Sequence, residues 1–261
     1  MCIESSVGPG AANGRADVTI VQVLLCLASS ATGSGGGPAV DGGFGQETEK
    51  AIRAFQQTAM RVAVPDGRVA PGSPTLQKLA DTIPPGLSPL KLRGIMPAAS
   101  APRVDTYWPH LDPAMQAYEI NTPLRRAHFL AQIGHESGAL RYAEEIASGQ
   151  AYEHRADLGN TQPGDGQRFK GRGLIQLTGR ANYEAYGQAK GRDFLGDDTS
   201  KALASDPAIA VDVAGWFWKT RGLNQLADTD DIEKVTRRIN GGLTNLPDRK
   251  AYLLRSRFFR P

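Results

Sequence analysis

The sequence has little cysteine and no long apolar run, and each shortage excludes a class of protein. Its two cysteines, Cys2 and Cys26, lack the paired spacing of a disulfide framework or a cysteine zinc site, so two free thiols are expected. The most apolar stretch, residues 18–31, follows Arg15 as a signal peptide would, but Gln22 interrupts it and it is too short to span a membrane. We interpret it as a packed helix, with a signal sequence as the alternative.

Charge of one sign is also scarce, since the formal net charge is only +3 in 261 residues. The basic excess lies at the end of the chain, where residues 234–261 hold eight basic side chains and one acidic side chain. Such a segment suits an anionic partner such as a bacterial envelope or nucleic acid, but a solvated basic helix that completes a cleft is the explanation we prefer. We expect no nucleic-acid partner.

A motif with turn and helix signals occupies residues 40–57, VDGGFGQETEKAIRAFQQ. Ala51, Ile52 and Phe55 recur at helical spacing behind an Asp-Gly-Gly turn, and residues 65–80, PDGRVAPGSPTLQKLA, repeat the pattern more weakly. This motif resembles the small three-helix peptidoglycan-binding domain attached to many cell-wall hydrolases. The resemblance covers about residues 17–82 and accounts for residues 18–28 as the first helix.

A proline-rich segment at residues 81–89, DTIPPGLSP, interrupts helical periodicity and marks the expected domain boundary. We therefore predict one domain over residues 1–84 and a second over 85–261. The second should be mainly α-helical, because no strand series appears. Its expected helices cover residues 90–95, 112–118, 123–136, 181–190, 207–220, 232–239 and 248–258.

One carboxylate, Glu136, stands in the last turn of the helix that Thr122 and Pro123 begin. Its position at the edge of the apolar face and at the negative end of the helix dipole favours the neutral carboxyl group, as a general acid requires. An ordinary solvent-facing glutamate is the simpler alternative. The neighbouring His135 suggests a zinc protease, but Ala139 stands where the HExxH pattern needs histidine. We expect the histidines to be structural and a zinc amidase to be a remote option.

A second carboxylate lies close downstream, at Glu144 or Glu145. If the helix continued, nine residues would turn Glu145 to the opposite face from Glu136. We therefore predict that the helix breaks at Ser137-Gly138 and that the chain returns. Carboxyl groups about 6.5 to 9.5 Å apart would admit a water molecule and give inversion at the anomeric carbon.

Two glycine-bearing segments supply polar side chains suited to sugar. In residues 169–183, FKGRGLIQLTGRANY, an extended strand would direct Gln176 and Thr178 to one face and Ile175 and Leu177 to the other. A structural glycine-rich loop is the alternative. In residues 239–242, INGG, Asn240 precedes two glycines, which turn chemistry alone would also explain.

Together, HES with a downstream glutamate, GRGLIQLTGRANY, the GWFW helix and INGG resemble glycoside hydrolase family 19, over about residues 87–261. This family contains chitinases and many phage endolysins, and the wording of residues 159–183 is closest to the phage lysozymes. The resemblance implies Glu136 as general acid, Glu145 as general base and Thr178 as the residue that positions water, with Glu144 and Glu153 as competing bases. It implies substrate contact or site support at Gln176, Asn182, Tyr183, Asn240 and Arg249, to which we add Tyr152 as a sugar contact. Core packing is expected for the aromatic cluster of residues 216–218.

We therefore expect a mainly α protein, in which a small three-helix domain precedes a larger lysozyme-like domain with a small β-hairpin or extended segment. Its expected function is that of a monomeric, cofactor-free endolysin that hydrolyses the β-1,4 bond between N-acetylmuramic acid and N-acetylglucosamine in peptidoglycan. A chitinase and a non-catalytic wall-binding phage structural protein are the alternatives. Without a convincing signal sequence, the chain should accumulate in the host cytoplasm and act on periplasmic peptidoglycan.

Overall fold

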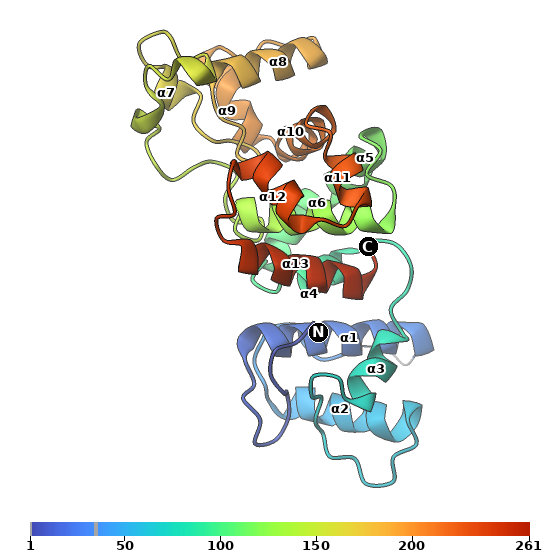
Figure 1. The fold of residues 1–261 in the computed structure, drawn as a ribbon. Helices are drawn as coiled ribbons and strands as arrows, with labels where there is room; N and C mark the ends of the chain where they lie inside the picture. The colour runs from blue at the N-terminus through green and yellow to red at the C-terminus, as the bar shows by residue number, and fades with distance from the viewer. Residues whose placement is uncertain (1, 34–35) are drawn as a thin grey trace. The chain divides into compact units, whose positions relative to one another are not determined.

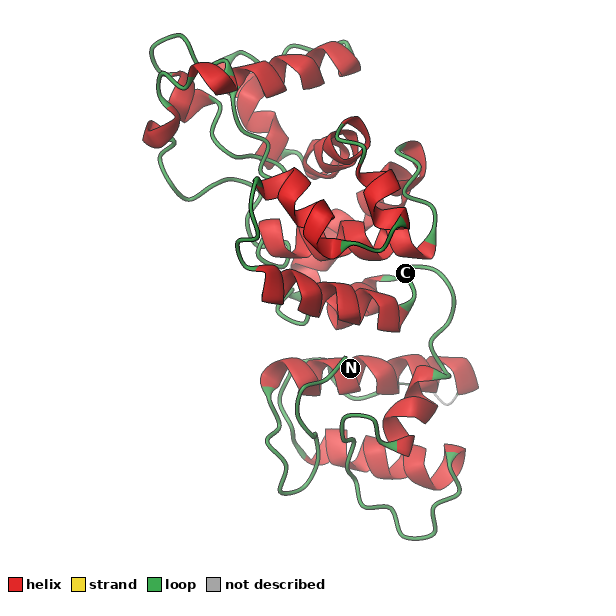
Figure 2. Cartoon of the chain, viewed as in Figure 1, coloured by secondary structure: helices red, strands yellow, loops and turns green. Residues whose placement is uncertain are grey.

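The computed structural model describes residues 2–33 and 36–261 as helices joined by loops (Figures 1 and 2). Within those ranges no extended strand forms, and β pairing is limited to isolated bridges. The helices gather into two compact units, one of residues 1–101 with 251–261 and one of residues 102–250. The predicted mainly α class is confirmed.

The first unit is built around α1 (Arg15–Thr32), which packs against α2 (Gln46–Ala59), α3 (Pro74–Ala80) and α4 (Pro89–Ile95). Its apolar side chains, such as Val21 and Leu24, are fully buried. The prediction of a packed helix at residues 18–28 is confirmed, because burial of these side chains against three neighbours stabilises α1.

Both cysteines are free thiols, as predicted. Burial raises the pKa of Cys2 to about 12, so this thiol stays protonated at neutral pH. Over the described part of the chain, no helix combines the length and apolar character that crossing a membrane requires.

The polar residue that interrupts the apolar run of α1 fastens a loop to the helix. Gln22 is buried, and its Nε2 donates to Asp41 Oδ1 at 2.9 Å and to Thr48 Oγ1 at 3.1 Å. Its Oε1 accepts from the Gly42 amide at 2.8 Å. One side-chain amide thereby provides hydrogen-bond partners both for the loop at residues 41–42 and for the beginning of α2.

The weaker sequence repeat folds in the same way. Gln56 on α2 donates to Asp66 Oδ1 at 2.6 Å and to Thr75 Oγ1 of α3 at 3.2 Å, and accepts from the Gly67 amide at 2.9 Å. Two hydrogen bonds lower the pKa of Asp66. The larger effect comes from the Arg68 backbone amide and the smaller from the Gln56 side chain. The unit therefore contains two copies of one helix, turn and helix arrangement.

The first unit also includes α4 and the end of α13 (Leu246–Phe259). Phe259 packs so tightly on Gly94 that a β-carbon there would lie 2.2 Å from its ring. Lys91 is buried, donates to three backbone carbonyl groups and has its pKa lowered to about 8 by desolvation. The predicted domain boundary between residues 84 and 85 does not coincide with the limits of these compact units, and it stays a prediction.

The second unit holds the other helices: α5 (Ala101–Ala117), α6 (Pro123–Glu136), η1 (Gln150–Tyr152), η2 (Ala156–Leu158), α7 (Asp165–Arg168), α8 (Arg180–Lys190), α9 (Asp197–Ser205), α10 (Pro207–Thr220), α11 (Leu223–Asp228) and α12 (Ile232–Asn240). The predicted α6, α8, α10 and α12 are confirmed within one residue. The expected start of α5 at Asp112 is wrong, because the helix begins at Ala101 and accommodates Pro109 and Pro113. Short helices α7, α9 and α11 were not expected.

Aromatic side chains of α10 lie in the core of this unit, as predicted. Trp218 is fully buried and meets Phe129 of α6 edge to face, with ring centroids 5.4 Å apart. Its indole nitrogen donates to Asn224 at 2.9 Å, so the one polar atom of the ring is satisfied. α6 is therefore held by packing along its length, which positions its last residue.

The two glutamine anchors make the stability of the first unit testable. We expect Gln56→Ala to lower the free energy of unfolding by about 2 kcal/mol, because buried donors and acceptors of the turn lose their partner. The exposed neighbour serves as control, and Gln57→Ala should change stability by less than about 0.5 kcal/mol. Chemical denaturation measures both, and equal effects of the two substitutions would contradict the anchoring role.

Candidate active site

The helix that carries Glu136 ends where the sequence predicted. Thr122 caps its beginning by accepting from the Arg125 amide at 3.2 Å, and Ser137 follows its last residue. The next three residues, 138–140, all have left-handed φ values of 56° to 62°. The predicted break at Ser137-Gly138 is confirmed, and the chain leaves the helix axis immediately after Glu136.

A buried arginine holds the Glu136 side chain. Nη2 of Arg249 lies 2.6 Å from Glu136 Oε1, and the two side chains are 2% and 17% exposed. This contact is an ion pair, and among the described residues no aligned hydrogen-bond donor faces Glu136 Oε1. Arg249 also donates to Gln132 Oε1, one helical turn before Glu136.

The histidines near Glu136 have carboxylate partners rather than a metal-binding arrangement. His135 Nδ1 lies 2.6 Å from Asp248, and buried His128 Nε2 lies 2.9 Å from Asp230. Across residues 2–33 and 36–261, no group of three or more potential ligands is arranged to hold a metal ion. These contacts fit the structural role expected for His128 and His135.

Beyond the break, the chain pairs with the glycine-rich segment. Glu145 donates its amide to the Gly171 carbonyl at 2.9 Å, and its Oε2 accepts from the Gly171 amide at 3.1 Å. Its Oε1 accepts from the Tyr152 hydroxyl at 3.0 Å. The pKa of Tyr152 is raised, mainly by burial and then by this carboxylate. Glu145 is therefore fixed by two neutral donors and remains half-buried.

The two competing glutamates are engaged differently. Glu144 pairs with Arg172 Nε at 2.9 Å and lies 3.6 Å from Lys170, so two cations neutralise it. Glu153 accepts from the amides of Gly164 and Gly166, both at 2.7 Å, and these bonds lower its pKa. Both carboxylate oxygens of Glu153 therefore hold a loop. Of the three glutamates, Glu145 has the carboxylate that neither pairs with a cation nor accepts from two backbone amides.

The expected extended strand at residues 174–178 is wrong. Residues 173–176 form a tight turn, closed by the bridge between Arg172 and Leu177, with Gln176 at a left-handed φ of 58°. Gly173 (φ 75°) allows this turn, and a β-carbon there would also meet Val213 at 2.3 Å. The separation of polar and apolar side chains still holds, because the turn buries the apolar residues 175 and 177 and leaves Gln176 half-buried.

The turn brings Gln176 and Glu145 to the same glycine. A β-carbon on Gly171 would lie 2.9 Å from Gln176 Oε1 and 3.2 Å from Glu145 Oε2. Gln176 itself donates to the Gly173 carbonyl at 3.0 Å. A larger residue at position 171 would require the ends of both side chains to shift, so their observed positions depend on this glycine.

Three further predicted residues occupy different environments. Thr178 donates its hydroxyl to the Gln176 carbonyl at 3.0 Å, and Asn182 donates to the Thr178 carbonyl at 2.7 Å. Tyr183 is fully buried and donates to the Lys170 carbonyl at 2.7 Å, so it supports the segment and does not face solvent. Asn240 is exposed at the end of α12.

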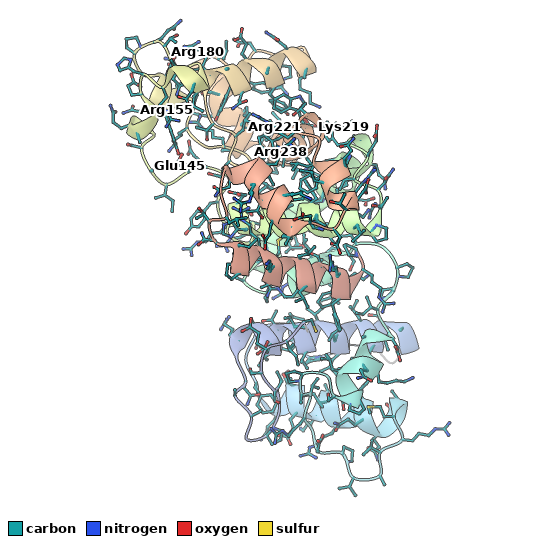
Figure 3. All side chains as sticks on the ribbon, in the orientation of Figure 1. Glu145, Arg155, Arg180, Lys219, Arg221 and Arg238 are labelled. Carbon is teal, nitrogen blue, oxygen red and sulfur yellow. The ribbon has the colours of Figure 1, made fainter. Side chains whose placement is uncertain are left out.

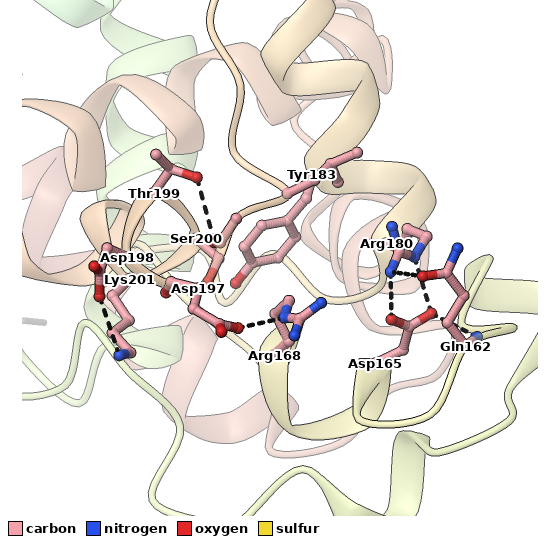
Figure 4. A network of polar contacts seen from close by, with 12 residues as sticks. Gln162, Asp165, Arg168, Arg180, Tyr183, Asp197, Asp198, Thr199, Ser200 and Lys201 are labelled. Atoms are coloured by element: carbon pink, nitrogen blue, oxygen red, sulfur yellow. Dashed lines mark hydrogen bonds and ion pairs between the residues drawn. The ribbon is translucent and has the colours of Figure 1, made fainter.

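A network that the sequence reasoning missed fixes the segment around the turn (Figure 4). Buried Asp165 pairs with Arg180 at 2.6 Å, and this bond lowers the pKa of Asp165. Asn160, also buried, accepts from the Arg180 amide at 2.8 Å and donates to the Tyr152 carbonyl at 2.9 Å. Asn160 thereby connects α8 to the tyrosine that contacts Glu145. The sequence feature that could have indicated this network is the presence of Asn160, Asp165 and Arg180 in and next to the glycine-rich segment of residues 159–179.

A cavity of about 460 Å³ lies elsewhere in this unit, between α5, α8 and α10. Its lining includes Asp212, which accepts from the hydroxyls of Tyr118 and Tyr186 and pairs with Lys190. None of the predicted site residues lines it. The carboxylates that could perform hydrolysis are therefore outside this cavity.

Comparison with known proteins identifies similar sequences and folds. A family model described as chitinase class I matches residues 123–234. A glycosyl hydrolase family 19 domain-containing protein of Haemophilus influenzae is 34% identical, over 48% of this chain and 75% of that protein. An Arabidopsis thaliana endochitinase is 40% identical over 46% of this chain, but only 40% of its own length is matched. Chitinase C from Streptomyces griseus shares the fold, with a TM-score of 0.54 and 24% identity over 66% of this chain and 91% of that one.

The buried ion pair leads to a stability prediction. Arg249→Met should lower the free energy of unfolding by about 3 kcal/mol, because Glu136 and Gln132 lose their partner inside the protein. Lys250→Met is the matched control, since the exposed pair of Lys250 with Glu233 should contribute less than about 1 kcal/mol. Chemical denaturation of both variants measures the difference, and a Lys250 effect as large as that of Arg249 would refute the anchoring.

The shared glycine leads to an activity prediction. Gly171→Ala should reduce glycoside hydrolysis about tenfold or more, because the new methyl group displaces Gln176 and Glu145 from their positions. Gly45→Ala is the control, as a β-carbon there meets nothing within 4 Å. Initial rates on a soluble glycan, with thermal melting to confirm folding, provide the measurement. Wild-type rates in Gly171→Ala would show that the position of these side chains is unimportant.

Proposed function

The chain belongs to glycoside hydrolase family 19, and we propose that it hydrolyses the β-1,4 bond between N-acetylmuramic acid and N-acetylglucosamine in peptidoglycan. It is a chitinase-like glycoside hydrolase with a lysozyme-like helical fold. The observation that carries the proposal is a pair of glutamates on either side of the helix break, each fixed by a separate set of contacts. Two carboxyl groups suffice for this chemistry, and no cofactor is required.

In the proposed reaction Glu136 protonates the oxygen of the leaving sugar. The ion-pair partner of Glu136 keeps the geometry, since Arg249 is itself held by Gln132. Removal of such a proton donor typically costs about 10² to 10⁴ in rate.

Glu145 acts as the base that deprotonates the attacking water. Its carboxylate accepts from a tyrosine hydroxyl and a backbone amide, whereas the carboxylate of Glu144 pairs with Arg172. Thr178 follows the turn of residues 173–176, and its hydroxyl would orient the attacking water molecule. Attack from the face opposite the leaving group inverts the anomeric carbon, and this mechanism generally requires a carboxyl separation of about 6.5 to 9.5 Å.

Chitin is the second candidate substrate, and one observation favours it. The Arabidopsis thaliana and Streptomyces griseus relatives are named as chitinases. Both substrates are β-1,4 polymers that carry acetamido groups, so Gln176 and Asn240 could contact either. The resemblance of residues 17–82 to peptidoglycan-binding domains favours peptidoglycan, because a wall-binding unit would raise the local concentration of the enzyme on that polymer.

The proposal extends to the biological setting. A phage endolysin made in the host cytoplasm would reach periplasmic peptidoglycan once the membrane is breached, and would act as a monomer. The exposed basic side chains near the end of the chain would then meet an anionic envelope.

Substitution of each glutamate tests the roles. Glu136→Gln and Glu145→Gln should each lower the rate on purified peptidoglycan at least about 100-fold, whereas Glu144→Gln should lower it less than about tenfold. Mass spectrometry of the wild-type digest should find N-acetylmuramic acid at the new reducing ends. N-acetylglucosamine there would indicate a glucosaminidase, hydrolysis of chitin alone would establish the chitinase, and binding without any cleavage would support a structural wall protein.

A further inference from the structure

A pocket lined by three cationic side chains lies beside α11 and α12. It has a volume of about 320 Å³, and its lining consists of Leu226, Lys234, Arg237 and Arg238. No carboxylate is among these lining residues. A concave surface with this charge attracts anions, and its single apolar residue suits a ligand with a short aliphatic part.

The cationic groups of the pocket retain donors for a ligand. Arg237 is exposed, and among the described residues no acceptor bonds its guanidinium. Arg238 uses one nitrogen to donate to the Arg221 carbonyl at 2.9 Å, and Lys234 lies 3.1 Å from Asp231 across one turn of α12. An arginine fork with free donors matches the two oxygens of a carboxylate, which it binds more strongly than a neutral group.

Direct contacts connect this pocket to the predicted catalytic segment. Arg238 bonds to Arg221, and Arg221 Nη2 donates to Asn182 Oδ1 at 3.3 Å. Asn182 in turn donates to the carbonyl of Thr178 at 2.7 Å. Arg221 follows α10 and Arg238 lies on α12, and Figure 3 shows the two residues next to each other. Three successive contacts therefore relate the pocket to Thr178.

We propose that the pocket of Lys234, Arg237 and Arg238 binds a carboxylate on the peptide of a peptidoglycan strand and thereby selects peptidoglycan over neutral chitin. This inference rests on the proposed function, because it assigns a substrate feature to the same site. Peptidoglycan peptides carry carboxylates next to short aliphatic side chains, whereas chitin carries neither. The α12 cations thus serve substrate choice, a more specific role than general attraction to an envelope.

Binding of a muropeptide tests the pocket independently of hydrolysis. The probe is a disaccharide tetrapeptide, titrated by calorimetry at low salt into the full chain carrying Glu136→Gln. Adding Arg237→Gln should weaken binding about tenfold, because one charged hydrogen-bonding partner is lost. Arg237 makes no bond to other described residues, so the substitution should leave folding intact. Lys201→Gln removes another exposed charge, which lies outside the pocket, and should leave binding unchanged.

The same titration with a muropeptide whose carboxylates are converted to amides identifies the recognised group. The amidated probe should bind about tenfold more weakly than the native probe and should be insensitive to Arg237→Gln. Equal affinity of the two probes, or native binding unaffected by Arg237→Gln, would overturn the assignment.

Hydrolysis separates failure of this inference from failure of the proposed function. In the enzyme with Glu136 intact, Arg237→Gln should lower the ratio of the peptidoglycan rate to the glycol chitin rate about tenfold, while Lys201→Gln keeps the wild-type ratio. An unchanged ratio overturns the pocket's role with the function intact. A wild-type enzyme that cleaves only glycol chitin overturns the function, and the muropeptide titration still decides whether the pocket binds carboxylates.

Discussion

The buried ion pair between Arg249 and Glu136 is the interaction on which the site depends. Arg249 is almost fully enclosed, and it connects α13 to α6 through both Glu136 and Gln132. Gln132 also donates to Thr236 of α12 at 3.3 Å, so three helices meet around one guanidinium. Because an isolated buried charge is costly, the packing of these helices and the position of the carboxylate are coupled.

The second glutamate depends on an unrelated set of constraints. Glu145 is fixed by Gly171 and Tyr152, which belong to a region with little regular structure. Side-chain bonds replace helical packing there, and Asp165 with Arg180 forms its best-buried pair. Two carboxylates with different chemical surroundings therefore arise from two different structural solutions, one a packed helix and the other a cross-linked loop. Such contrast in environment is how acid and base roles are separated.

The sequence predicted the helices well where caps and apolar periodicity agree. Thr122, Pro123 and the apolar face of residues 124–133 defined α6, and a rotation argument located its break. The turn at Gln176 was missed because alternating polarity is typical of a strand, whereas here a glycine and a left-handed residue produce the same sidedness. The contacts of Arg249 and Asn160 could not be predicted, because each joins residues distant in sequence through side-chain geometry alone. The roles of the site residues stay predictions.

The most direct test of two-carboxylate catalysis is the configuration of the first product. Proton NMR can follow the anomeric signal of the new reducing end during the first minutes of hydrolysis of a soluble β-1,4 glycan, before mutarotation. Direct attack of water activated by Glu145, with Glu136 as acid, predicts that the α-anomer appears first. Initial appearance of the β-anomer would mean retention through a second displacement and would contradict the assignment of Glu145 as a base.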